Sequence, residues 1–112
     1  MAYDEDLADR VRALLGGENG VTEQRMFGGL AFLLGGNMAI AIGPDDILAR
    51  VDPDDAEALI ASTPAEAAVM GGRRMRGWLE VRHEHLTDDG KLSPWVERGA
   101  AYARSLPAKK RR

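Results

Sequence analysis

The chain has 112 residues, of which 45% are hydrophobic, 29% are charged and none is cysteine. This composition suits a single globular domain and excludes a disulfide scaffold, a zinc knuckle and a cysteine nucleophile. The longest apolar runs are five residues, far short of the roughly 20 needed to cross a bilayer, and the acidic N-terminus is unlike a signal peptide. We therefore expect a cytoplasmic protein.

The net charge of −3 hides an uneven distribution along the chain. Residues 1–66 hold thirteen acidic and four basic residues, whereas residues 67–112 hold five acidic and eleven basic residues. Such asymmetry can indicate contact with nucleic acid or with a partner protein. In a compact domain the two halves can also interleave and cancel, which is the interpretation we favour.

An amphipathic helix is predicted over residues 4–15, because Leu7, Val11, Leu14 and Leu15 recur at the spacing of one helical face. Glycines at 16 and 17 then suit its C-terminal end. From residue 21 the period changes to two, which is typical of strands. We predict four strands, over residues 22–27, 30–34, 38–42 and 47–51. Short links make them an antiparallel meander.

The second half of the chain is predicted to contain two helices and two strands. Asp52 and Pro53 begin a helix whose buried face is Ala56, Leu59 and Ile60, and which ends at Thr63 and Pro64. Strands follow at 67–70 and 77–82, on either side of a glycine- and arginine-rich segment, and a last helix runs from Ser93 and Pro94 through Ser105.

This order of elements predicts an α+β fold, a two-layer sandwich of an antiparallel sheet with three helices on one face. The packing face of the last helix is expected to be Val96, Gly99, Ala100 and Ala103. We expect residues 1–107 to form one domain and residues 108–112 to form a disordered basic tail.

The two histidines, His83 and His85, flank Glu84. On a strand they would share a face and could both reach one metal ion, but no nearby His or Cys supplies the further ligands. We therefore interpret the segment as an exposed strand end and predict no metal and no cofactor. No nucleophile elbow, phosphate-binding loop or dinucleotide fingerprint is present.

Candidate binding residues gather around one glycine pair, Gly71 and Gly72. Three arginines and a tryptophan follow: Arg73, Arg74, Arg76 and Trp78. This segment could bind an anion through its backbone N–H groups, or it could be a hairpin or bulge whose arginines solvate an edge strand. Arg25, at the threshold of another glycine pair, could pair with a carboxylate or offer its guanidinium to a ligand anion.

The C-terminal charges Lys109, Lys110, Arg111 and Arg112 could touch a polyanion weakly and in a salt-dependent manner. Without them the chain keeps eleven basic against eighteen acidic residues. A domain this acidic is expected to bind duplex DNA poorly.

Several blocks of the sequence together resemble the N-terminal domain of the TfoX/Sxy family. The blocks follow in the family order and are RMFGGLAF (25–32), NMA (37–39), LARVD (48–52), MGGRRMRGW (70–78), WV (95–96) and AYA (101–103). The resemblance covers nearly the whole chain. The first and fourth blocks are its most specific parts.

The resemblance implies a fold like that of small secretion-chaperone domains and a role in regulating competence genes, as a co-activator working with the cyclic-AMP receptor protein. It implies no catalytic residues. Full-length competence regulators carry a second, helical domain, so the resemblance implies a stand-alone short member. The His-Glu-His segment is not part of the family pattern.

Two functions follow as hypotheses. The first is a non-enzymatic regulatory domain that binds a protein partner, with Arg73, Arg74, Arg76 and Trp78 anchoring an acidic surface. The alternative is a domain that binds a small molecule or anion where Arg25, Arg73 and Arg76 converge near glycine turns. Homodimerisation through an exposed strand face is compatible with either function.

Overall fold

The computed structural model describes residues 3–26, 29–70 and 72–107. Its helices and strands, in chain order, are α1 (Glu5–Leu14), β1 (Val21–Met26), β2 (Gly29–Leu34), β3 (Asn37–Ile42), β4 (Asp46–Arg50), α2 (Ala56–Ser62), β5 (Glu66–Met70), β6 (Arg73–Arg82) and α3 (Asp89–Ser105). Short 3-10 turns occupy Pro53–Asp55 and His83–His85. The predicted tail, residues 108–112, lies outside the described residues.

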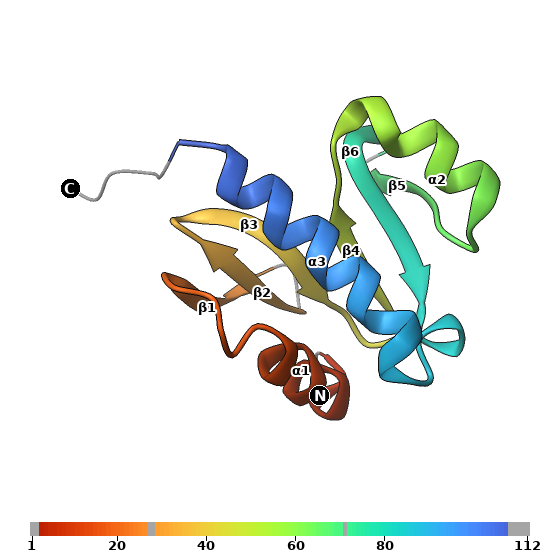
Figure 1. Cartoon of the computed structure of the whole chain (residues 1–112). Helices are drawn as coiled ribbons and strands as arrows, with labels where there is room; N and C mark the ends of the chain where they lie inside the picture. The colour runs from red at the N-terminus through yellow and green to blue at the C-terminus, as the bar shows by residue number, and fades with distance from the viewer. Residues whose placement is uncertain (1–2, 27–28, 71, 108–112) are drawn as a thin grey trace.

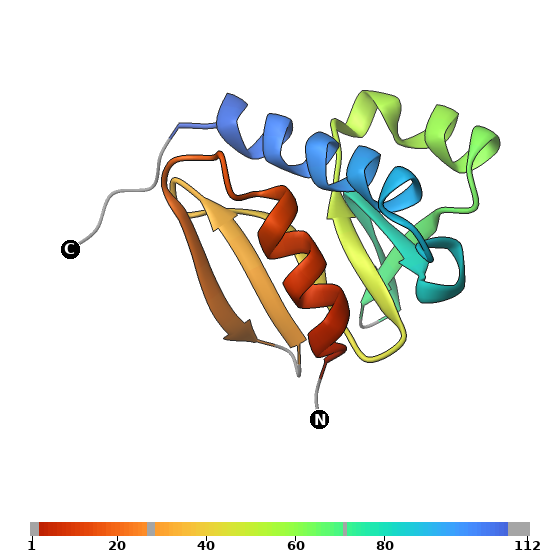
Figure 2. The same ribbon diagram turned by 60° about the horizontal axis from the view of Figure 1, so that its bottom comes forward.

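All six strands form one antiparallel sheet in the order β1-β2-β3-β4-β6-β5. Helices α1 and α3 lie on the same side of this sheet, with α3 crossing β3 and β4 (Figures 1 and 2). Helix α2 packs beside β6 and β5, and its Leu59 and Ile60 lean on the same core. The predicted α+β sandwich is therefore confirmed.

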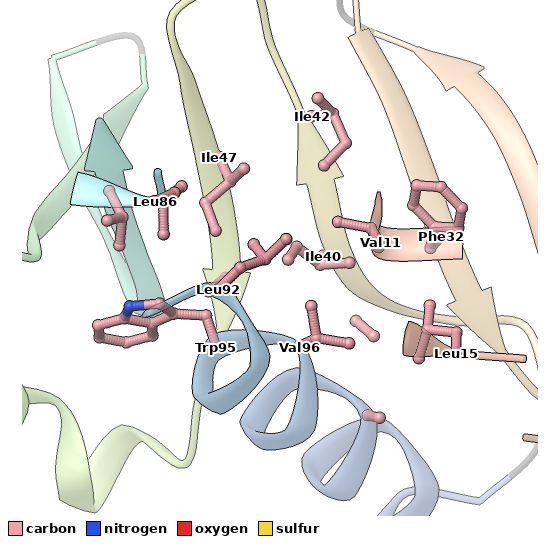
Figure 3. Packing of buried hydrophobic residues seen from close by; sticks show 14 of the residues in the cluster. Val11, Leu15, Phe32, Ile40, Ile42, Ile47, Leu86, Leu92, Trp95 and Val96 are labelled. Carbon is pink, nitrogen blue, oxygen red and sulfur yellow. The ribbon is translucent and has the colours of Figure 1, made fainter. Parts of the chain in front are cut away.

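The core lies between the sheet and the helices (Figure 3). Phe32, Ile40 and Ile47 of the sheet are fully buried, and they meet Val11 of α1 and Val96 of α3. Burial of one such side chain stabilises a fold by about 1.5–3 kcal/mol, so this layer supplies most of the favourable free energy. The four residues predicted for the packing face of α3 are all buried.

Two predicted boundaries were wrong. The last helix begins four residues earlier than predicted, because the Asp88 carboxylate accepts a hydrogen bond from the Lys91 N–H (3.0 Å) and caps it there. Pro94 lies inside the helix rather than at its start. The glycine- and arginine-rich segment was predicted between two strands, yet β6 already begins at Arg73.

Acidic and basic halves of the sequence interleave in space. Arg104 pairs with Glu18 (2.7 Å), Arg74 with Glu57 (2.7 Å), and Arg10 with Asp89 (3.0 Å). Each of these pairs joins the two halves of the chain, and the first two offset part of the asymmetry seen in the sequence. None of the described helices has the length and apolar character that spanning a membrane requires.

Candidate functional site

The face of the sheet turned away from the helices carries a hydrophobic groove. Strand alternation sends Ile47 and Ala49 of β4 into the core and Leu48 to the opposite face. There Leu48 meets side chains from three other strands, β1, β3 and β6, and together they line a hollow of about 210 Å³. We call this hollow the sheet-face groove and define it by six side chains: Met26, Met38, Asp46, Leu48, Met75 and Trp78.

A glycine in β6 brings Met75 and Trp78 to the same face. Residues three apart in a regular strand point to opposite faces, but Gly77 has φ +82° and the pairing with β5 shifts register around it. The Val51 N–H donates to the Gly77 carbonyl oxygen (2.9 Å), so this irregular point is tied to the end of β4. A β-carbon on Gly77 would lie 3.2 Å from the Val51 oxygen.

Arg50 fixes the tryptophan of the groove. Its guanidinium lies 5.3 Å from the centre of the Trp78 ring and 5.4 Å from that of Tyr102 on α3. It also donates a hydrogen bond to the Met38 carbonyl oxygen (3.3 Å). Stacking between two rings is typical of the planar, delocalised guanidinium. Arg50 thus links the groove to the helix layer, a role that nothing in the sequence indicated.

One end of the groove is acidic. Asp46 lines it, and Glu80 lies beside Asp46 on the neighbouring strand β6. A hydrogen bond with Asp46, burial and the charge of Asp46 raise the pKa of Glu80 to about 7, against a smaller opposing effect of Arg82. Two carboxyl groups held together in this way share a proton near neutral pH. Neither residue was a candidate in the sequence.

The arginines predicted for binding lie elsewhere. Arg74 pairs with Glu57 of α2, and Arg76 lies 4.0 Å from Asp54, so both face carboxylates of the chain itself. They border a second hollow, of about 400 Å³, between α2 and β6, which Met75 and Trp78 also line. Arg73 is exposed, Gly72 adopts φ +79°, and Gly71 lies outside the described residues.

Arg25 is far from these arginines across the sheet. It lies on β1, which three strands separate from β6, or about 19 Å at the usual strand spacing. Its Cα partner Leu30 faces the core, so Arg25 projects to the helix side, 5.9 Å from the centre of the Tyr3 ring. The structure therefore does not bring Arg25 together with Arg73 and Arg76.

A family model described as the TfoX N-terminal domain matches residues 13–103 of the chain. The chain belongs to the TfoX N-terminal domain family. This is a regulatory type of domain, linked to competence for DNA transformation, and not a known enzyme family. Comparisons with curated proteins and with solved structures give no match.

Four of the six blocks that carry the resemblance to this family converge on the groove. RMFGGLAF supplies Met26, NMA supplies Met38, LARVD supplies Leu48, and MGGRRMRGW supplies Met75 and Trp78. Met26 and Trp78 are 52 residues apart in the sequence, and the sheet places them at the same groove. Phe27, Gly28 and Gly71 of the blocks lie outside the described residues.

The histidines of this TfoX N-terminal domain form a 3-10 turn, so the predicted strand end was wrong. The two ring nitrogens of His83 lie near Asp4 (Nδ1 to Oδ2, 3.4 Å) and the Asp46 carbonyl oxygen (Nε2, 3.2 Å), which joins α1 to β4. His85 lies 3.6 Å from Glu84. Within the described ranges no three His, Cys, Asp or Glu side chains are arranged to hold a metal ion.

Proposed function

We propose that this chain is a non-catalytic regulatory domain that binds another protein through the sheet-face groove, within transcription control of competence. The family supports the regulatory character and the link to DNA transformation. The partner, and any connection to the transcription machinery, belong to the proposal alone.

One observation carries the proposal: the family blocks meet at a groove that no described helix covers. Three methionines, a leucine and a tryptophan from four strands line it, all partly buried. Methionine side chains adapt to varied apolar partners, and tryptophan is among the commonest anchors of protein interfaces. A face built only for folding would gain nothing from leaving these side chains beside solvent.

A surface centred on the arginines is the less favoured site for the partner. Glu57 and Asp54 already face Arg74 and Arg76, so an acidic partner would have to displace carboxylates of the chain. Exposed pairs of this kind contribute little, about 0–1 kcal/mol, so the displacement itself is not costly. The two surfaces are therefore distinguished best by mutation.

Affinity purification followed by mass spectrometry tests the proposal. The groove variant combines Met38→Ala with Leu48→Ala, which line the groove but not the hollow beside the arginines. The arginine variant combines Arg74→Glu with Arg76→Glu. Val69→Ala is the matched control, because Val69 is 59% exposed and lies outside the groove. Circular dichroism first verifies that each variant is folded.

We expect the groove variant to lose partners that the control and the arginine variant retain. Identical partners for groove variant and control would refute the groove as the binding surface. A transformation assay in a strain lacking the gene tests the regulatory part: complementation by the control but not by the groove variant is expected. Transformation unaffected by loss of the gene would refute the link to competence.

A further inference from the structure

We propose that the sheet-face groove binds a peptide segment of the partner that carries an apolar side chain two residues from a lysine or arginine. The apolar side chain would rest on Met38, Met75 and Trp78, and the basic head would lie at Asp46 and Glu80. This inference rests on the proposed function and names the chemistry that the groove recognises.

The size of the groove limits its occupant. A hollow of about 210 Å³ holds one large side chain, such as leucine or phenylalanine, with its backbone outside. It is too small for a drug-sized ligand, whose pockets are about 300–1,000 Å³. Its apolar walls therefore suit a single anchoring side chain of a peptide.

The negative charge at the Asp46 end of the groove determines which side chain the peptide carries near its apolar anchor. Glu80 contacts Asp46 of β4, so two carboxyl groups meet there, and Glu66 on β5 is the Cα partner of Glu80. Arg82 of β6 is the Cα partner of Asp46, but its ion pair within 4 Å is with Glu84 (3.7 Å). His83 contacts the backbone oxygen of Asp46, on the side of Asp4. A cation from a partner complements this end.

The spacing between anchor and cation follows from the geometry of extended peptides. Side chains at positions i and i+2 point to the same side of a strand, about 6.5–7 Å apart. Asp46 itself lines the groove, so a lysine or arginine on the groove-facing side of the peptide can reach its carboxylate. Lysine and arginine also cover apolar surface with their methylene stems.

Binding of the cation is coupled to loss of a proton. Because the pKa of Glu80 is about 7, the carboxyl pair carries less negative charge in mild acid than above neutral pH. A cation favours the ionised pair, so affinity should rise as the pH rises through 7. A purely apolar occupant would show no such dependence.

Four tripeptide amides with acetylated N-termini serve as probes: Phe-Ala-Lys, Phe-Ala-Gln, Phe-Ala-Glu and Ala-Ala-Lys. Titrations follow the indole N–H resonance of Trp78, assigned with Trp78→Phe. We expect Phe-Ala-Lys to bind about three- to fivefold more tightly than Phe-Ala-Gln, the range of an exposed ion pair. Phe-Ala-Glu and Ala-Ala-Lys should bind more weakly still.

Glu80→Gln should remove the rise in the preference for lysine over glutamine between about pH 6 and pH 8, because only Asp46 then remains charged at this end of the groove. Glu97→Gln is the matched control and should keep this rise, since Glu97 is exposed, lies on α3 and is outside the groove. Asp46→Asn provides a second variant with the same expected loss.

Equal affinity for the lysine and glutamine peptides would overturn the inference. Tightest binding of Phe-Ala-Glu would overturn it in favour of the arginine surface. If no peptide binds while native partners still require Met38 and Leu48, this inference fails and the proposed function stands. If native partners ignore those residues, the proposed function fails whatever the peptides do.

Discussion

Gly99 of α3 lies directly on the backbone of Ala39 in β3. A β-carbon on Gly99 would come within 2.3 Å of the Ala39 carbonyl oxygen and 3.0 Å of its carbonyl carbon. Ala39 lies at the point where the register between β2 and β3 shifts, so the strand bulges toward the helix. Only a residue without a side chain lets α3 approach the sheet this closely.

Gly99→Ala should therefore destabilise the domain by about 1–3 kcal/mol, the usual cost of overpacking, even though alanine is the better helix former. Urea unfolding monitored by circular dichroism measures the change. Gly17→Ala is the matched control, because a β-carbon there has no neighbour within 4 Å. Equal stability of both variants would show that α3 can shift without cost.

Gly77→Ala combines strain with a close contact. The positive φ of +82° costs a non-glycine residue about 1–2 kcal/mol, and the new β-carbon would crowd the Val51 oxygen and Pro53 at 3.2 Å. Gly72→Ala has nearly the same φ but open space, so it measures the strain alone. We expect the Gly77 variant to lose more stability in urea than the Gly72 variant and to shift the Trp78 resonance. Equal losses would mean that the contact with β4 is unimportant.

The periodicity of apolar residues predicted most of the helices and strands, because it reflects which side chains of these elements are buried. Alternation in β4 and the spacing of Leu7 and Val11 in α1 report burial directly. In β2 and β3, whose pairing shifts register, most residues are buried and strict alternation is lost. Errors arose where a local side-chain contact outweighs the pattern. Asp88 caps α3 ahead of the Ser93-Pro94 signal, and the histidines turn as a 3-10 helix between two elements.

The candidate site was only partly predictable. Trp78 was recognised as a binding residue, but Met26, Met38 and Leu48 read as ordinary strand residues. Their convergence depends on the strand order β1-β2-β3-β4-β6-β5, in which β6 inserts between β4 and β5. No local pattern encodes that order. The strand order also places β2, β3 and β4 between Arg25 on β1 and Arg73 on β6.

Arg50→Gln should increase the mobility and exposure of the Trp78 side chain. The variant removes two ring contacts and the hydrogen bond to Met38, and each ring contact contributes about 0.5–1 kcal/mol at exposed sites. We expect a loss of about 1–2 kcal/mol in the free energy of unfolding and stronger quenching of Trp78 fluorescence by acrylamide. Arg98→Gln, which removes a single contact to Trp95, is the control. An unchanged quenching constant would contradict the restraint on Trp78.

Deletion of residues 109–112 should remove any binding to duplex DNA. These four residues are all basic, whereas the rest of the chain is strongly acidic. Fluorescence anisotropy at about 50 mM salt should show weak binding of the full chain, independent of DNA sequence, that disappears by about 200 mM. The truncated chain should not bind at either concentration. Sequence-selective binding by the truncated chain would instead assign DNA recognition to the folded part.

Glu80 should make the stability of the domain depend on pH. Its pKa is about 7 in the folded chain and near 4.5 when unperturbed, so between these values the folded state holds a proton that the unfolded chain releases. The stabilisation from this group is therefore complete below about pH 4.5 and is lost as the pH rises through 7. Glu80→Gln should stabilise the domain relative to wild type near pH 8 and flatten this part of the profile, whereas Glu97→Gln, an exposed change on α3, should leave it unchanged. Urea unfolding at several pH values measures the effect, and parallel profiles for wild type and Glu80→Gln would contradict the sharing of a proton between Asp46 and Glu80.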